Sequence, residues 1–397
     1  MSRWEMVQLE TVCDVRDGTH DSPKYIEVGY PLITSKNLSN GIIDFDNVRY
    51  ISEEDYIKIN QRSYVDNGDI LMPMIGTIGN PIIVDKTREF AIKNVALIKF
   101  NSGKVINRYI NYCLKCNLFI EYIEKENRGG TQKFLSLNNI RKFYIPLPPL
   151  DIQKHIADTL DKTQEIIDGH KKQLKELDNL IKANFYDMFG DPYDNLGNWN
   201  IYTLQEMLDN RYILEHLDGN HGSLYPRSEE YVDSGVEYIG ANCIIDGTVN
   251  FNNAKYISIS RAQQFKKGVA KDGDVLFAHN ATVGPVAVLH TSNEYVILST
   301  SLTYYRCNNK LINNKYLMYF MQTDFFKNQY TKNMGQTTRN QVPITVQRRL
   351  KHMIPPIVLQ TRFATIVTNI EQQKAIVKQS IKEAENLFNS LMSKYFD

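Results

Sequence analysis

The chain has 397 residues, and its 46 lysines and arginines are balanced by 45 aspartates and glutamates, which gives a formal net charge of +1. That balance argues against a uniformly basic nucleic-acid-binding protein, but it allows local basic patches. The length is enough for two domains, each with its own core. We find no apolar run of eighteen residues and no charged-then-apolar leader, so we expect a cytoplasmic protein without a membrane span.

The second half of the sequence repeats the first. The matched segments are Tyr50-Ile51-Ser52 with Tyr256-Ile257-Ser258, Gly68-Asp69-Ile70-Leu71 with Gly273-Asp274-Val275-Leu276, Gly76-Thr77-Ile78-Gly79 with Ala281-Thr282-Val283-Gly284, Asp17-Gly18-Thr19-His20 with Asp218-Gly219-Asn220-His221, and Pro148-Pro149 with Pro355-Pro356. A repeat this long predicts two copies of one module. We therefore expect the function to be double as well.

Residues 1–150, here named head 1, show a mixed α and β pattern. Short apolar segments at 69–72, 81–84 and 95–98 are separated by glycine and asparagine, which is typical of strands joined by turns. The stretch 107–127 is predicted to be helical. Residues 191–357, here named head 2, repeat this pattern, so the fold class is α+β with two similar globular domains.

The five cysteines are scattered, which suits a reducing compartment. Cys113 and Cys116 form the only close pair, and they lie in the predicted helix. Neither a second pair nor a neighbouring histidine completes a zinc site, so we expect no metal.

Two stretches, 151–190 and 358–397, carry apolar residues with alternating steps of four and three. The seam is formed by Leu160, Ile167, Leu174, Leu177 and Ile181 in the first stretch, and by Val367, Ile370, Val377, Ile381 and Phe388 in the second. This spacing predicts two helices that pair as a coiled coil. Polar seam residues such as Thr163 and His170 weaken the apolar stripe, and a helix lying on its own head is the alternative.

The chain direction favours antiparallel pairing of the two predicted helices. If they were parallel, the segment between them would have to return the full helix length, roughly 60 Å at about 1.5 Å per residue. Antiparallel pairing removes that requirement. It predicts a pseudo-twofold arrangement, with one head at each end of the coil.

Short polar and basic loops occur at the same place in both copies. In the first copy the loop contains Thr131, Gln132 and Lys133, and in the second it contains Gln336, Thr337 and Arg339. Lysine and arginine neutralise phosphates, while glutamine and threonine offer donor and acceptor groups to base edges. The pattern therefore indicates DNA contacts, and a solvated surface loop is the alternative.

The repeated Asp-Gly-x-His segments carry Thr19 and His20 in the first copy and Asn220 and His221 in the second. No nucleophile or metal ligand lies beside these histidines in the sequence, which argues against a general base. Either the turn presents its side chains to DNA, together with Thr77 and Thr282 of the later turns, or it is a purely structural Asp-Gly turn.

In the order and duplication of these motifs the chain resembles the specificity subunit of type I restriction-modification systems. The motifs that carry the resemblance are the paired Gly-Asp-Ile-Leu and Gly-Asp-Val-Leu segments, the Gly-Thr-Gln loop, the Ile-Pro-Leu-Pro-Pro-Leu segment at 145–150 and the helix-ending Met188-Phe189-Gly190-Asp191-Pro192. The second copy departs from the pattern, because Gly335-Gln336-Thr337 inverts the order of threonine and glutamine.

The resemblance implies a non-catalytic DNA-reading adaptor. Each head would be a target recognition domain for one half of a split asymmetric site, and the coil would set the spacing and dock two modification subunits. The chain itself would bind no cofactor. S-adenosylmethionine would belong to the modification subunits, and ATP and Mg to restriction subunits, whose presence the sequence leaves open.

Two other classes of function are compatible with the sequence. A stand-alone methyltransferase or nuclease would need a cofactor or metal motif, and we find neither a phosphate-binding loop nor a Gly-x-Gly-x-x-Gly turn. A coiled-coil scaffold without DNA specificity is the other alternative.

Overall fold

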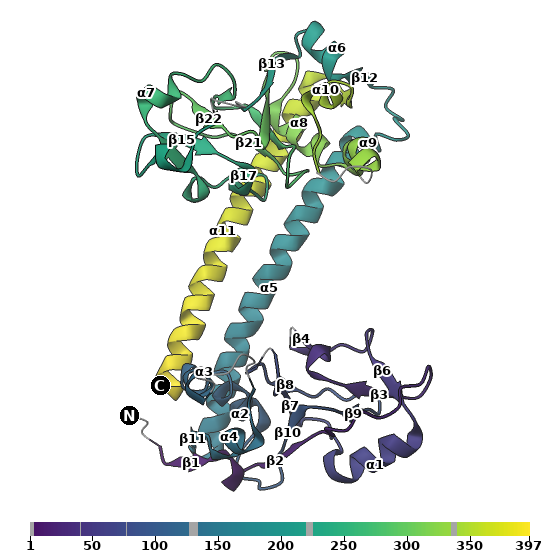
Figure 1. The fold of residues 1–397 in the computed structure, drawn as a ribbon, viewed down its shortest axis with the longest axis vertical. Helices are drawn as coiled ribbons and strands as arrows, with labels where there is room; N and C mark the ends of the chain where they lie inside the picture. Colours follow the sequence, from purple (N-terminus) through teal and green to yellow (C-terminus); the bar gives the residue numbers. More distant parts are fainter. Residues whose placement is uncertain (1–3, 40, 77, 127–133, 220–224, 335–339) are drawn as a thin grey trace. The chain divides into compact units, whose positions relative to one another are not determined.

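The computed structural model describes all residues except 1–3, 40, 77, 127–133, 220–224 and 335–339. The chain divides into two compact units (Figure 1). Unit 1 consists of residues 1–173 together with residues 377–397, and unit 2 consists of residues 174–376. Each unit contains one head and parts of both long helices.

Head 1 has a four-stranded antiparallel sheet in the order β2-β10-β7-β8, a three-stranded sheet in the order β6-β3-β9, and the pair β1-β11. Its elements are β1 (Met6–Gln8), β2 (Asp14–Asp17), β3 (Tyr30–Ile33), β4 (Leu38–Ser39), β5 (Ile42–Ile43), β6 (Arg49–Ile51), α1 (Glu53–Ser63), β7 (Ile70–Pro73), β8 (Ile82–Ile83), β9 (Ala91–Ile92), β10 (Val95–Lys99), α2 (Asn107–Cys113), α3 (Asn117–Glu126), α4 (Leu137–Lys142) and β11 (Tyr144–Pro146). Every residue of the central strand β10 is buried, as its apolar sequence predicts.

The predicted helix over 107–127 was wrong in one respect, because the structure breaks it into α2 and α3. Leu114, Cys116 and Phe119 are all buried in the core of head 1. Residues two apart point to different sides of a continuous helix. The break therefore lets Leu114 and Cys116 enter the same core.

Head 2 repeats the four-stranded sheet and the two-stranded pair, and its remaining sheet has five strands instead of three. Its sheets have the orders β13-β23-β20-β21, β14-β18-β15-β22-β19 and β12-β24. Its elements are β12 (Asn200–Thr203), α6 (Leu204–Asp209), β13 (Ile213–Asp218), β14 (Tyr231–Val232), β15 (Val236–Ile239), β16 (Ile244–Ile245), β17 (Thr248–Val249), β18 (Lys255–Ile257), α7 (Ile259–Ala262), β19 (Val269–Ala270), β20 (Val275–Ala278), β21 (Val286–Val288), β22 (Val296–Leu298), β23 (Leu302–Cys307), α8 (Asn314–Met321), α9 (Asp324–Met334), α10 (Ile344–Gln347) and β24 (Lys351–Ile354). The four-stranded sheets of the two heads correspond strand by strand.

A buried ion pair recurs at the same place in both four-stranded sheets. In head 1 the Lys99 ammonium lies 2.6 Å from a carboxylate oxygen of the buried Asp69. In head 2 the Arg306 guanidinium lies 2.8 Å from the buried Asp274. Burial raises the pKa of both carboxyl groups, so each carboxylate depends on its cation.

A buried glutamine fixes the start of each long helix. The helices are α5 (Leu150–Phe189) and α11 (Ile357–Phe396). The Gln153 amide oxygen accepts from the Ile106 N–H at 3.1 Å, and its NH₂ donates to the Pro148 carbonyl at 2.8 Å. Gln360 makes the same pair of bonds, to the Asn313 N–H and the Pro355 carbonyl. The repeated Pro-Pro segment followed by glutamine is therefore the fixed junction between each head and its own helix.

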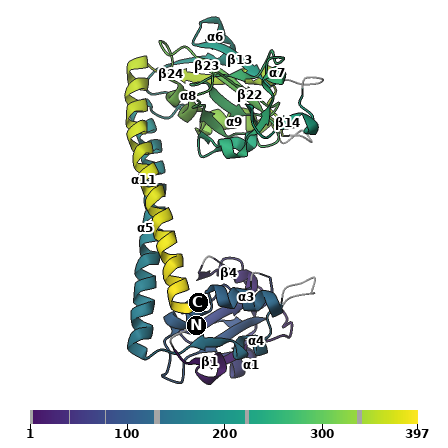
Figure 2. The same ribbon diagram turned by 90° about the vertical axis from the view of Figure 1, so that its left-hand side faces the viewer.

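The two long helices run antiparallel within each unit. In unit 1 the first part of α5 lies beside the last part of α11, and Lys171 pairs with Glu385 at 3.0 Å. In unit 2 Lys374 of α11 pairs with Asp178 of α5. Figure 2 shows the two helices from the side.

We predict that Lys99→Met strongly destabilises head 1, because it leaves the Asp69 carboxylate buried without a cation. Removing one partner of a buried pair costs about 3–5 kcal/mol. Lys99→Arg is the matched control, since Arg306 occupies this place in head 2. Hydrogen exchange of peptides from β7 and β10 measures the loss, with head 2 peptides as the internal reference. Equal protection in the Met and Arg variants would contradict the prediction.

Candidate nucleic-acid interface

In head 1, several segments meet at one end of the four-stranded sheet. Strand β10 pairs antiparallel with both β2 and β7, with Ala96 opposite Asp17 and Val95 opposite Pro73. Strands β2 and β7 therefore both end where β10 begins. The residues that follow β2 and β7 lie beside the two residues before β10, Lys93 and Asn94.

The segment before α4 reaches the same end of the sheet. The Leu135 N–H donates to the Met74 carbonyl at 2.9 Å, and Ile75 forms a β-bridge with Phe134. We name the segments 18–20, 74–76, 93–94 and 134–135 edge 1. The predicted loop residues Thr131, Gln132 and Lys133 and the turn residue Thr77 lie outside the described residues, and they adjoin edge 1 in the sequence.

Head 2 builds the same edge from corresponding segments. Asp218 lies opposite Thr303, and Ala278 lies opposite Leu302. Asn280 forms a β-bridge with Gln341, and the Ala281 N–H donates to the Asn340 carbonyl at 3.1 Å. We name the segments 218–219, 279–282, 299–301 and 340–342 edge 2. The predicted residues Asn220, His221, Gln336, Thr337 and Arg339 lie outside the described residues.

The Asp-Gly turn of each head packs tightly against its neighbouring strand. A Cβ atom on Gly18 would lie 2.2 Å from the Ile92 carbonyl oxygen, and one on Gly219 would lie 2.3 Å from the Ser299 carbonyl. Glycine is therefore required by the close backbone approach in both heads. This supports a structural role for the turn, which the sequence had left as one of two alternatives.

His20, the histidine of the first turn, is nevertheless exposed and held in a defined position. Its Nδ1 lies 2.8 Å from the Asn94 side-chain oxygen, and its Nε2 lies 2.7 Å from a carboxylate oxygen of Asp17. The side chain is 60% exposed. Both partners are acceptors, so the arrangement favours a ring that carries both protons. The hydrogen bonds with Asn94 and Asp17 raise the pKa of His20 above its ordinary value.

Arg62 of α1 brings a second cation to this cluster. Its guanidinium donates to the other carboxylate oxygen of Asp17, while two-thirds of the side chain stays exposed. The buried carboxylate of Asp17 therefore orients His20 and Arg62 together, and both are side chains of the kind that bind phosphate.

The other two described residues of the predicted DNA-binding set also lie at the edges. Thr19 is partly exposed, and its hydroxyl accepts from the Asp21 N–H at 3.1 Å. Thr282 is exposed in edge 2, next to Ala281, whose φ of 63° is left-handed. Gly76 takes the corresponding conformation in head 1, with a φ of 82°. An alanine in this strained conformation is typical of functional sites.

Sequence reasoning missed four polar residues that the structure places at the edges. They are Lys93, Asn94, Asn340 and Gln341. The signal available in the sequence was their position next to strand ends or to the predicted loops. Their proximity to the Asp-Gly turn and to the β20 end depends on sheet topology.

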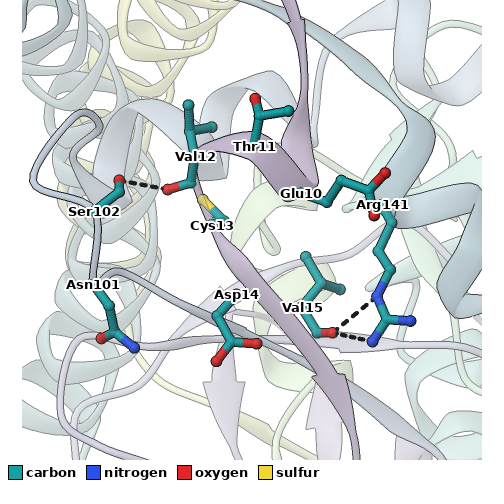
Figure 3. Close-up of a pocket in the computed structure, with 9 residues that line it drawn as sticks. All are labelled: Glu10, Thr11, Val12, Cys13, Asp14, Val15, Asn101, Ser102 and Arg141. Carbon is teal, nitrogen blue, oxygen red and sulfur yellow. Dashed lines mark hydrogen bonds between the residues drawn. The ribbon is translucent and has the colours of Figure 1, made fainter.

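Arg141, a basic residue of α4, binds a backbone carbonyl of its own head. Its guanidinium donates to the Val15 carbonyl at 2.6 and 3.1 Å, as Figure 3 shows. It lines an open cavity of about 450 Å³ together with Glu10 and Asp14. In the strand register Asp14 lies opposite Lys99, at the end of β10 far from Val95, so this cavity is remote from edge 1.

The predicted seam residues lie on one side of each long helix. Leu160, Ile167, Leu177, Ile181, Val367, Ile370 and Val377 are buried, and Leu174, Ile381 and Phe388 are partly buried. Thr163 is buried too, and its hydroxyl donates to the Thr159 carbonyl of its own helix at 2.9 Å.

Neither a metal cluster nor a membrane-spanning helix is found where the structure can be described. Among the described residues no three histidine, cysteine, aspartate or glutamate side chains are grouped to hold a metal ion. Cys113 is fully buried, and burial raises the pKa of its thiol. No described helix is both long and apolar enough to cross a membrane.

Comparison with known proteins finds similarity along the whole chain. The family model described as "Type I restriction modification DNA specificity domain" matches residues 1–179 and again residues 198–386. The Type I restriction enzyme MjaVIII specificity subunit of Methanocaldococcus jannaschii is 20% identical over 403 residues, which cover 98% of this chain and 91% of the relative. The EcoBI specificity subunit of Escherichia coli is also 20% identical, over 99% of this chain and 85% of the relative.

Solved structures share the fold. The S subunit of a type I restriction-modification system from M. genitalium matches with a TM-score of 0.59 and 16% identity, over all of this chain and 96% of that one. A chain from a study of type I complex assembly and conformational transition matches with a TM-score of 0.60 and 18% identity, over 99% and 97% of the two chains. The expected α+β fold with two repeated heads and two long helices is confirmed.

We predict that His20 titrates above its ordinary pKa of about 6.5. Its positive charge should be present below that pKa and be lost as the pH rises through it. Asp17→Asn should lower the pKa, whereas Arg62→Gln should raise it, because the Arg62 charge opposes protonation. NMR of histidine-labelled protein measures both shifts. Shifts of the same sign in the two variants would contradict the geometry.

Proposed function

Because the chain belongs to the family of type I restriction modification DNA specificity domains, we propose that its two heads read the two halves of one split, asymmetric DNA site. Its relatives are named specificity subunits, the non-catalytic DNA-recognition part of type I restriction-modification systems. The chain is therefore a DNA-recognition subunit and not an enzyme. The resemblance noted in the sequence is confirmed.

The observation that carries the proposal is the repetition of the same polar edge in two otherwise divergent heads. Edge 1 presents Thr19, His20 and Asn94, and edge 2 presents Thr282 and Gln341. A rigid sheet fixes the positions of the side chains at its strand ends. Such side chains can recognise DNA while the loops beside them differ between the two heads. Two such edges on one chain support a site with two halves.

The residue types divide naturally into two kinds of DNA contact. We propose that asparagine and glutamine side chains at the edges and in the adjoining loops hydrogen-bond base edges, where they pair best with adenine. Lys133, Arg339 and the His20–Arg62 pair would contact phosphates, which fix register without reading sequence.

We propose that the target recognition domains span 1–150 and 191–357, and that the helices 151–190 and 358–397 set the spacing between half-sites. DNA and modification subunits are the partners that membership of the family implies. We propose two modification subunits, which would carry S-adenosylmethionine, with ATP and Mg confined to restriction subunits. A net charge of +1 supplies little counterion-driven affinity, which supports a contribution of these partners to DNA binding.

The test is to express the chain with its modification subunits and sequence the methylated genome. A single bipartite, asymmetric motif is expected. Lys133→Ala and Arg339→Ala should weaken binding on all sequences and reduce the salt slope by about one unit. Gln132→Ala and Gln336→Ala should each relax one half-site, by roughly 1–3 kcal/mol of discrimination.

Each glutamine variant has its control in the other head, because only the half of the motif that the changed head reads should relax. The lysine and arginine variants should leave the motif itself unchanged. If all four variants leave the affinity and the motif as they are, these loops do not contact DNA. If the wild-type complex methylates no bipartite motif, the proposed function itself is wrong.

The long helices provide a separate prediction. Leu174→Pro places a proline in the middle of α5 and should cost about 3 kcal/mol or more within the helix. Methylation of the split site should then fail, while hydrogen exchange shows that the sheet of each head is still protected. Leu174→Met keeps the side-chain volume and is the control. Normal methylation by the proline variant would show that the helices do not set the spacing.

A further inference from the structure

The two heads differ sharply in one part of their cores. At six corresponding buried positions, head 1 has only apolar residues and head 2 has only residues with polar groups. The pairs, head 1 first, are Val15 and His216, Met74 and His279, Ala96 and Thr303, Ile98 and Tyr305, Ile140 and Gln347, and Ile145 and His352. The strand pairing supports the correspondence, because Val15 lies opposite Ile98 and His216 lies opposite Tyr305.

Gln347 is the centre of the polar network in head 2. Its side-chain oxygen accepts from the Thr303 hydroxyl at 2.9 Å, from His216 Nε2 at 3.0 Å and from the Tyr305 hydroxyl at 3.3 Å. Its NH₂ group donates to the Val342 carbonyl at 2.9 Å. Burial lowers the pKa of His216 to about 4, so the ring stays neutral and can donate through Nε2.

The bond to Val342 connects this network to edge 2. The Val342 N–H donates to the His279 carbonyl at 2.8 Å, and its carbonyl oxygen lies 3.2 Å from His279 Nδ1. The two residues before Val342 are Asn340 and Gln341. The Asn340 carbonyl accepts from the Ala281 N–H, and Gln341 forms a β-bridge with Asn280. A displacement of Val342 would therefore move the polar residues of the edge.

Head 1 fixes the corresponding segment by a different device. There the Ser136 hydroxyl caps α4 and accepts from the Asn139 N–H at 3.1 Å. Head 2 has Pro343 at that place, with no side-chain cap on α10. Gln347, one turn into α10, reaches back to Val342 instead. This bond ties Val342 to the end of α10, although it satisfies a carbonyl and not the free N–H groups at the helix start.

Stability alone does not account for the network. Head 1 shows that the fold accepts apolar residues at all six positions, and buried polar groups stabilise a core only when every partner is in place. The network adds directional contacts, because a hydrogen bond restricts the position of Val342 more narrowly than an apolar contact does. We infer that Gln347 is a positioning residue for DNA recognition by head 2, which holds Asn340 and Gln341 in place through Val342.

This inference rests on the proposed function, and its test uses the whole chain in complex with modification subunits. The main variant combines His216→Val, Thr303→Ala, Tyr305→Ile and Gln347→Ile, which gives head 2 the residues of head 1 at four of the six positions. A second variant, Gln347→Met, removes only the central amide. The control is Leu289→Val, which also introduces the head 1 residue, Val84, at a buried position of head 2 but lies outside the network.

Two measurements distinguish positioning from packing. Methylome sequencing should show that both network variants relax the second half of the motif, with methylation of single-base mismatches in that half rising roughly tenfold, while the first half is unchanged. Hydrogen exchange should show faster exchange of a peptide covering residues 340–346, with β13 and β23 still protected. Leu289→Val should change neither result.

Each alternative outcome is decisive. If the four-residue variant is folded and reads the second half as strictly as the wild type, the network is packing only and the inference is wrong. If that variant exchanges throughout head 2, the network is needed for folding, and a specific positioning role is rejected. If the wild-type complex has no bipartite motif, the proposed function fails instead, and the exchange measurement on residues 340–346 still tests whether Gln347 anchors that segment.

Discussion

Burial of aromatic side chains at the ends of the two long helices is the constraint on which each unit depends. Tyr109 of head 1 packs against Phe396 of α11, and Tyr316 of head 2 packs against Phe189 of α5, with ring centroids 5.6 and 4.9 Å apart. The tyrosine hydroxyls donate to the Pro146 and Met353 carbonyls. The core of each head is thus completed by the last residues of the long helix that follows the other head in the sequence. The long helix that follows each head directly is held at its start by the buried glutamine. Long helices with polar seam positions gain most of their stability from such packing.

The edges show how one scaffold can present different chemistry. The order of the four-stranded sheet and the tight Asp-Gly turn are the same in both heads, since they depend on backbone pairing and on glycine at 18 and 219. The side chains that the edges display, and the way the segment before α4 or α10 is anchored, differ between the heads. Recognition can therefore change while the fold stays fixed, because the variable groups lie where strands end and loops begin.

Much of the fold followed from patterns in the sequence, and the rest depended on tertiary contacts. Apolar runs at 69–72, 81–84 and 95–98 predicted the strands that the structure has at 70–73, 82–83 and 95–99, and the four-three spacing predicted the long helices. The break between α2 and α3 was missed, because it arises from the shape of the core around Leu114 and Cys116. At the site, the Asp-Gly turn was found from its repetition. Asn94 and Gln341 were not found. Asn94 lies beside that turn, and Gln341 lies beside Asn280, only because strands distant in the sequence pair with each other.

The composition of unit 1 has a consequence for synthesis on the ribosome. The core of head 1 includes Met392 and Phe396 beside Ile156 and Leu160, so it cannot be completed until residue 396 has been made. At about 5–20 residues per second, head 1 waits on the order of tens of seconds after its own residues have emerged. Unit 2 is one continuous stretch, and Phe185 and Phe189 precede the head that they complete. The nascent chain should therefore finish its second half first, while the surface around Tyr109 stays uncovered and open to a chaperone.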